Sequence, residues 1–392
     1  KLVKITVTQT QVGNKTNPKE LFDLKLPIGF GSLPEKKDKA PEIKTFTIRI
    51  HEREQTFYFP LEHKPDFISF DVGNHILKTV ELEYPLPELK NQLQQDPDPL
   101  SRICAAEALG KKGGLEAVKA FSTALQEEAF WGVRVEIVRN LAKIKLDQVF
   151  AELVEALKDK DARVRRAVIE ALGQIKTQES YKAVKSVAEK GDPSYYTEAA
   201  ALRALGSIVS SGLNDKSEEK TLKLLKSVLK ERQGWNEVVR SGAIGALSLM
   251  KTSEDALNLI LEYTEIGVPQ PLRLASIRAL GGISSGQSAL NLERILDRLK
   301  ALSRETFFLT QVSVANALGQ METSKAIGIL QSLAQQTPDG RVRRIAEEAV
   351  QRVQKNVGSD QAVKQLREEL DQLKQENQEL RSRLESLEAK AK

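Results

Sequence analysis

The chain has 392 residues, too many for one ordinary hydrophobic core, so we expect two or three structural units. Its composition, 40% hydrophobic and 29% charged residues, is typical of a folded, water-soluble protein, and no apolar run approaches the roughly 18–20 residues that cross a membrane. The net charge is only +5 and no lysine or arginine cluster alternates with aromatic residues, which argues against a nucleic-acid partner.

The first 87 residues carry the two-residue period of β-strands, beginning with the alternation in Val3–Val7. The same alternation returns in residues 22–26, 46–50, 57–59, 67–71 and 76–82. About six or seven short strands in this length predict a small β-sandwich domain over residues 1–87.

Turn residues divide these strands. Gly73-Asn74 predicts a hairpin between the last two strands. Gly29, Gly31 and the residues that follow them to Pro41 predict an exposed loop.

The rest of the chain repeats the phrase R-x-x-A-x-x-A-L-G at intervals of 31–42 residues, which is the mark of a repeat array. The Leu of each copy serves as its marker: Leu109, Leu141, Leu172, Leu205, Leu247, Leu280 and Leu318, with Val350 in a degenerate eighth copy. Each copy has an amphipathic helix, a turn and a second helix with the phrase, so residues 88–357 are expected to form an α-solenoid of about eight helix pairs.

Positions before the marker predict how each second helix begins. Eleven residues before it lies a side chain able to cap a helix in five copies: Asp98, Asp161, Ser194, Asn236 and Asp339. Seven residues before it lies a structural arginine in six copies: Arg102, Arg134, Arg165, Arg240, Arg273 and Arg343. Each arginine either pairs with the capping Asp on its own helix or bridges to the turn of the neighbouring repeat, and we favour the bridge.

No catalytic or metal-binding residue is expected in this chain, and no cofactor. The three histidines, His51, His63 and His75, have no second ligand at metal spacing, and no nucleophile elbow, phosphate loop or dinucleotide fingerprint occurs. The single cysteine, Cys104, lies among alanines and is expected to be an inert core residue. We expect a reducing compartment, the cytoplasm.

Aromatic residues, only 5% of the chain, gather at the turns between the two helices of a repeat. The candidates for a partner-binding edge are Trp131, Tyr195, Tyr196, Trp235, Phe307 and Phe308. They either fill gaps where a capping residue is absent or form an edge that docks a partner.

Residues 358–392 change to a heptad period, which predicts a parallel coiled coil that makes a homodimer. Asn377 at an a position favours two strands. The dimerisation residues are Val363, Leu366, Leu370, Leu373, Asn377, Leu380, Leu384 and Leu387.

Two resemblances follow from these motifs. The repeats look like bacterial HEAT-like repeats, which are also found in phycobilin lyases. The strand segments Phe22–Ile28, Gln55–Phe59, Lys64–Asp71 and Ile76–Lys78 are similar to the β-sandwich that follows the catalytic domain of M1-family zinc aminopeptidases. In that family a helical repeat domain follows the sandwich, but its zinc motif H-E-x-x-H matches nowhere in this chain.

The architecture expected is mainly α, with HEAT-like helix pairs between a small β-sandwich and a coiled coil. The M1 resemblance implies a non-catalytic C-terminal portion of an aminopeptidase-like protein. Its solenoid would shape substrate access or dock a catalytic domain, and zinc would belong only to that upstream domain. The chain begins Lys1-Leu2-Val3 in a strand pattern, so we expect it to continue a longer protein. The alternatives are a HEAT scaffold that binds a protein or peptide partner and a pigment-lyase-like protein.

Overall fold

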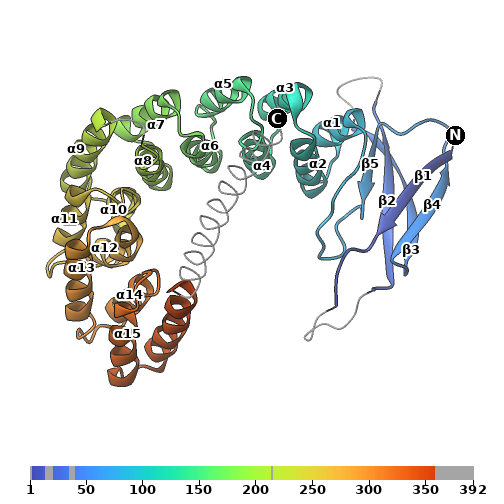
Figure 1. Ribbon diagram of the computed structural model, residues 1–392. Helices are drawn as coiled ribbons and strands as arrows, with labels where there is room; N and C mark the ends of the chain where they lie inside the picture. Colours follow the sequence, from blue (N-terminus) through green and yellow to red (C-terminus); the bar gives the residue numbers. More distant parts are fainter. Residues whose placement is uncertain (1, 14–20, 35–39, 213–214, 358–392) are drawn as a thin grey trace, which may run out of the picture. The chain divides into compact units, whose positions relative to one another are not determined.

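The computed structural model describes residues 2–13, 21–34, 40–212 and 215–357 (Figure 1). The predicted coiled coil lies outside the described residues. The chain divides into two compact units, Lys1–Val184 and Lys185–Lys392, and each is described by itself.

The strands of the first unit form two antiparallel sheets. The first pairs β1 (Leu2–Thr8) with β4 (Glu54–Pro60). The second has the order β3-β2-β5, with β2 (Leu24–Ser32) between β3 (Glu42–Ile50) and β5 (Phe67–Phe70). The described part of the predicted strand region therefore holds five strands.

One hydrophobic cluster joins the two sheets. The rings of Phe30 on β2 and Phe59 on β4 have centroids 4.8 Å apart, and Phe46 on β3 lies 5.3 Å from Phe59. Ile5, Leu26, Ile28, Ile48, Ile50 and Leu61 complete the buried cluster. Burial of these apolar side chains, at about 25 cal/mol per Å², is what holds the strand region together.

The loop predicted at Gly29 and Gly31 is wrong, because both glycines are buried within β2. A Cβ at Gly31 would lie 2.2 Å from the Phe67 ring, and one at Gly29 would lie 2.7 Å from the Ile43 side chain. These glycines serve close packing around a central strand rather than a turn.

The strand predicted at residues 76–82 is also wrong, because that segment has no strand structure. The turn at Gly73-Asn74 is present, but the fully buried carboxylate of Asp71 accepts hydrogen bonds from the backbone N–H groups of His75 and Ile76 and from Lys78 Nζ. These bonds hold the chain against the turn, so the segment does not extend into a hairpin.

The helices of the first unit form pairs that match the predicted repeats. They are α1 (Leu86–Gln95) with α2 (Pro99–Lys112), α3 (Gly114–Glu127) with α4 (Trp131–Leu141), and α5 (Asp147–Ala156) with α6 (Ala162–Ile175). The division between the units falls within α7 (Gln178–Lys190), which precedes α8 (Tyr195–Val209).

The second unit continues the same plan. Its further helices are α9 (Asp215–Glu231) with α10 (Val238–Leu249), α11 (Glu254–Glu262) with α12 (Gln270–Ile283), α13 (Ala289–Leu302) with α14 (Phe308–Leu318), and α15 (Lys325–Gln336) with a helix over 340–357. Short 3-10 turns, η1 (Trp235–Glu237) and η2 (Ser284–Gly286), adjoin α10 and α12.

The second helices of successive pairs pack on one another, α2 on α4 on α6 in the first unit and α8 on α10 on α12 on α14 in the second. The seven marker leucines are fully buried between them. The glycines after the markers allow the close approach, since a Cβ at Gly206 would lie 2.5 Å from the Ala246 carbonyl oxygen and one at Gly281 would lie 2.4 Å from that of Ala317. Within the described ranges, none of the helices has the length and apolar character needed to cross a bilayer.

Candidate functional site

The turns between the two helices of the repeats hold several buried ion pairs of the array. Arg102, on the second helix of the first pair, donates from Nε and Nη2 to the carboxylate of Glu128 at 2.7 and 3.0 Å. Its Nη1 donates to the carbonyl oxygens of Asp96 and Pro97 in its own turn. One guanidinium thus joins the turn of its own repeat to the turn of the next, a contact that we call a rung.

The same rung recurs in both units. Arg134 binds the Asp159 carboxylate with two hydrogen bonds, at 2.8 and 3.0 Å, and Arg273 binds the Glu305 carboxylate at 2.8 and 2.6 Å. The other three structural arginines donate to carbonyl oxygens of the turn or of the last turn of the preceding helix: Arg165 to Asp159 and Lys160, Arg240 to Leu229, and Arg343 to Ala334 and Thr337. The partner of the bidentate bonds is therefore the next turn, not the capping Asp of the same helix.

Two repeats without the arginine keep the rung in another form. Glu198 occupies the arginine position of the fourth repeat and accepts a hydrogen bond from Arg232 of the next turn, so that the signs are exchanged. Gln311 occupies it in the seventh repeat and accepts from the hydroxyl of Thr337 at 3.0 Å. Sequence reasoning missed both, although a carboxylate at the position that holds arginine in six other repeats was a signal for the exchange.

The predicted caps are present in three of the five copies. Asp98, Asp161 and Asp339 each accept a hydrogen bond from the backbone N–H two residues on, at 2.9 Å. Ser194 precedes α8 without a side-chain bond to it, and Asn236 lies inside η1 with a positive φ of 48°. The capping prediction is therefore wrong at both: Ser194 has the backbone of a cap but makes no side-chain bond, and Asn236 lies within the kink before α10.

The candidate aromatic residues fall into two groups. The exposed fractions are 46% for Tyr195, 51% for Tyr196, 57% for Trp235 and 45% for Phe307. Trp131 and Phe308, each the first residue of a second helix, are half-buried.

Trp131 and Phe308 are each covered by an arginine of the repeat that follows. The Arg163 guanidinium carbon lies 3.6 Å from the centre of the Trp131 ring, and that of Arg341 lies 4.0 Å from the centre of the Phe308 ring. In each case the aspartate that caps the arginine's own helix accepts two hydrogen bonds from the guanidinium. The distances are 3.0 and 2.7 Å for Asp161 and 3.1 and 2.8 Å for Asp339.

Those arginines also set the acidity of the caps. The hydrogen bond from Arg163 lowers the pKa of Asp161 to about 2, and that from Arg341 lowers the pKa of Asp339 to about 2. Neither arginine was among the predicted site residues. The signal was the sequence D-x-R-V-R, which follows a repeat with an aromatic first residue both times.

The aromatic residues of the fourth and fifth repeats form a separate cluster. The rings of Tyr196 and Trp235 meet edge to face with centroids 6.3 Å apart. A Cβ at Gly234 would lie 3.8 Å from the Tyr195 ring, which places that ring beside the same turn. We call Tyr195, Tyr196 and Trp235 the aromatic cluster. Among the side chains that the structure describes, no cation lies over these three rings.

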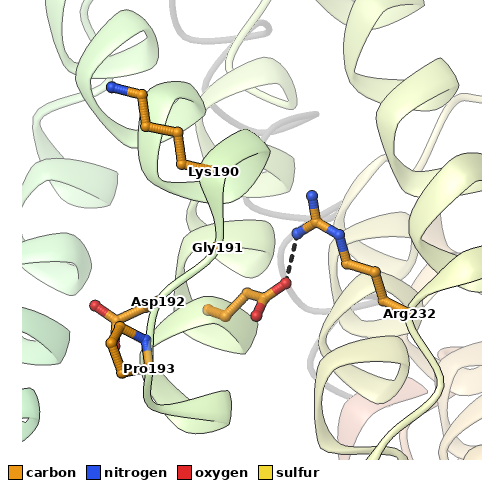
Figure 2. A pocket seen from close by; sticks show the side chains of 6 residues that line it. Lys190, Gly191, Asp192, Pro193 and Arg232 are labelled. Atoms are coloured by element: carbon orange, nitrogen blue, oxygen red, sulfur yellow. Dashed lines mark hydrogen bonds and ion pairs between the residues drawn. The ribbon is translucent and has the colours of Figure 1, made fainter.

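An open pocket of about 410 Å³ adjoins this cluster and is lined by residues 190–193, Glu198 and Arg232 (Figure 2). Arg232 also donates to the carbonyl oxygens of Ala188 and Glu189 at the end of α7, at 2.7 and 2.8 Å, while the Lys190 side chain points away from it. The guanidinium is thus held by the Glu198 carboxylate and two helix-end carbonyl oxygens rather than offered to a ligand.

Cys104 is partly buried, and burial raises the pKa of its thiol, which favours the uncharged form. Among the described residues, no group of three or more His, Cys, Asp or Glu side chains is arranged to hold a metal ion.

A family model described as HEAT repeats matches residues 118–206. The match runs from within α3 to within α8, across the rungs of Arg134 and Glu198. The chain is similar to HEAT repeats over these residues. No curated protein matches this chain.

Solved structures are similar to the chain at low identity. Human deoxyhypusine hydroxylase in complex with glycerol is 21% identical over 69% of this chain and 96% of that one, with a TM-score of 0.31. The complex of CpcE and CpcF of phycocyanin lyase from a Nostoc species is 19% identical over 71% and 98%, with a TM-score of 0.38. The karyopherin Kap121p bound to Pho4p is 15% identical over 73% and 35%, with a TM-score of 0.44. None of these matches points to an M1 aminopeptidase.

Proposed function

We propose that this protein is a HEAT-repeat scaffold that binds a protein partner along the turns of its repeats, without peptidase activity of its own. The observation that carries the proposal is the exposure of Tyr195, Tyr196, Trp235 and Phe307 at turns of the second unit. Aromatic side chains are costly to leave in water and are enriched among the residues that dominate binding surfaces. Because the turns recur with the repeat within the second unit, one partner segment can meet several of them.

The gap-filling interpretation fits the two half-buried residues better than the exposed ones. Trp131 and Phe308 each pack beneath an arginine of the next repeat, which is a structural use. Tyr196 and Trp235 contact each other and leave half of their surface in water. The proposed binding edge is therefore narrower than the set predicted from the sequence, and its centre is the aromatic cluster.

The test replaces Tyr195, Tyr196 and Trp235 together with Ser in the full chain. Extract of the source cells is passed over the immobilised wild type and over this variant, and retained proteins are quantified by mass spectrometry. We expect at least one protein whose retention falls roughly tenfold, with an unchanged far-ultraviolet dichroism spectrum and cooperative melting. Tyr58→Ser is the matched control, since Tyr58 on β4 is 58% exposed but lies outside the repeats. Equal retention by all three proteins would refute the binding edge.

We further propose that the heptads from Val363 to Leu387 join two copies of the scaffold in parallel, which would double the number of edges presented to a partner. The strand region would form a small β-sandwich in front of the first repeat. Analytical ultracentrifugation of the full chain and of a chain ending at residue 359 decides the first point. A dimer only in the longer chain is expected, and monomers in both would end that proposal.

A second candidate, the non-catalytic C-terminal portion of an M1-type aminopeptidase-like protein, is favoured by one observation. The strand region is fixed to the first helix pair by polar contacts: Ser69 Oγ donates to the Asp96 carboxylate, Lys64 pairs with Glu88, and Asn91 donates to the Asp66 carbonyl oxygen. Strands docked in front of helical repeats follow the order of that family. The coding sequence upstream decides it, because the absence of H-E-x-x-H and a later Glu would defeat this candidate.

A further inference from the structure

We propose that the aromatic cluster of Tyr195, Tyr196 and Trp235 binds an arginine side chain of the partner protein. The inference rests on the proposed scaffold function and names the chemistry that its binding edge recognises. The chain itself twice builds the contact that we assign to the partner, an arginine over an aromatic residue at the start of a second helix.

The internal contacts define what a filled position looks like. Trp131 and Phe308 lie ten residues before their marker leucines, and the arginines over them lie nine residues before the next marker. A guanidinium over an aromatic face is stabilised by the ring quadrupole and is less strongly hydrated than an ammonium group. The face of each ring is therefore shielded from water by a cation of the neighbouring repeat.

The aromatic cluster has the aromatic ring of this contact, but the chain has no arginine at the position that would cover it. Tyr195 lies ten residues before Leu205, at the position of Trp131 and Phe308. The position nine residues before the next marker holds Val238, and in the repeat after that it holds Pro271. Neither side chain can supply a cation, so Tyr195, Tyr196 and Trp235 remain about half exposed.

The charge around the cluster favours a cationic occupant. Residues 189–198 and 231–237, which carry the cluster, hold five carboxylates (Glu189, Asp192, Glu198, Glu231 and Glu237) and two basic side chains (Lys190 and Arg232). Arg240, which pairs with Glu237, and Lys185, which pairs with Glu189, reduce the excess of negative charge from three to one. A partner segment with a protruding arginine meets both the aromatic faces and this excess.

The test uses the two tryptophans of the chain as separate reporters. The full chain labelled with 5-fluorotryptophan gives one fluorine signal for Trp131 and one for Trp235, assigned with Trp131→Phe and Trp235→Phe. The probes are the blocked tripeptides acetyl-Gly-Arg-Gly-amide, its lysine counterpart and its citrulline counterpart, which keeps the shape but not the charge. We expect the arginine probe to shift the Trp235 signal saturably at millimolar concentration and to bind roughly fivefold more tightly than the citrulline probe.

Arg163→Ala provides the matched control within the same molecule. In the wild type the Trp131 signal should not respond, because Arg163 already covers that ring. In the variant the ring is uncovered, and its signal should shift with the arginine probe while that of Trp235 is unchanged. A Trp131 signal that responds equally in the wild type and in the variant would overturn the internal template on which the inference rests.

A Trp235 signal that ignores the arginine probe, or follows the citrulline probe equally, overturns the inference. That failure is distinguishable from failure of the scaffold proposal. Suppose that the Trp235 signal does not respond to the arginine probe, but the wild type retains a partner from the extract that the triple Ser variant loses. The binding edge then stands, and only its arginine chemistry is refuted. If the lysine probe binds more tightly than the arginine probe, the guanidinium specificity is likewise refuted.

Discussion

Arg163 makes two contacts at once, lying 3.6 Å over the Trp131 ring and holding the Asp161 carboxylate with two hydrogen bonds. Asp161 is also the cap of α6, since it accepts a hydrogen bond from the Arg163 backbone N–H. Asp161, which caps α6, thus positions the Arg163 side chain that covers the Trp131 ring of the previous repeat. The same arrangement occurs at Phe308, Asp339 and Arg341.

Removing the arginine should therefore expose the indole ring and loosen the cap together. In a Trp235→Phe background, which leaves Trp131 as the sole tryptophan, we expect Arg163→Ala to shift tryptophan emission to longer wavelength and to increase quenching by acrylamide. The free energy of unfolding should fall as well, because the cation–π contact and the bonds to the cap are lost together. Arg166→Ala, which removes an exposed arginine one turn along α6, is the control. Unchanged quenching in Arg163→Ala would contradict the stacking.

The exchanged rung between Glu198 and Arg232 predicts rescue by a double exchange. Glu198→Arg places two cations together at a largely buried position, so we expect a loss of about 3 kcal/mol in the free energy of unfolding. Adding Arg232→Glu restores the sign order of the Arg134–Asp159 rung and should recover at least half of that loss. Chemical denaturation measures all of these variants.

The control for that cycle is the exposed pair Lys158–Glu155. Lys158→Glu should change the free energy of unfolding by less than about 0.5 kcal/mol, because exposed ion pairs contribute little. A double variant no more stable than Glu198→Arg alone would show that the rung does not depend on its charge pairing.

Periodic features were the ones that sequence reasoning located well. The marker leucines and the small residues around them recur because each second helix must bury the same face against its neighbours, and all seven leucines are fully buried. Apart from the segment at 76–82, the strands with two-residue alternation were found for the same reason, since one face packs in the shared core.

Features that depend on a distant partner were missed. Nothing local marks Arg232 as the partner of Glu198, 34 residues earlier, because the intervening α9 lengthens that repeat. Gly31 resembles a loop residue until Phe67 is placed against it. In both cases the decisive contact belongs to tertiary packing, which overrides local turn propensity.

The lowered pKa values of Asp161 and Asp339 predict a loss of stability in acid. Both folded-state values, about 2, lie below the ordinary 3.8, so the contribution of each carboxylate is fully present above pH 4 and disappears as the pH falls through 2. The difference in melting temperature between the wild type and Asp161→Asn/Asp339→Asn should therefore shrink between pH 4 and pH 2. A constant difference over that range would contradict the arginine–cap bonds.

Asp96 should show the opposite sign. Burial raises the pKa of its carboxyl group, so the folded protein binds this proton more readily than the unfolded chain does. The contribution is fully present below pH 3.8 and is lost as the pH rises through the raised value. The wild type should gain stability relative to Asp96→Asn when the pH falls from 7 to 4, as measured by thermal unfolding. A difference that moves the other way would place the Asp96 carboxylate in a more polar site than the one described.

The close approach of α12 and α14 predicts that a single methyl group at Gly281 destabilises the second unit. The Cβ of Gly281→Ala would lie 2.4 Å from the Ala317 carbonyl oxygen and 2.8 Å from its Cα, so backbone must separate from backbone. Such overpacking costs about 1–3 kcal/mol. A Cβ added at Gly328 in α15 would have no neighbour within 4 Å, and Gly328→Ala should instead stabilise by about 0.5–1 kcal/mol because alanine favours the helix. Thermal unfolding of the two variants should therefore shift in opposite directions, and a loss at both sites would mean that helix propensity and packing have been assigned wrongly.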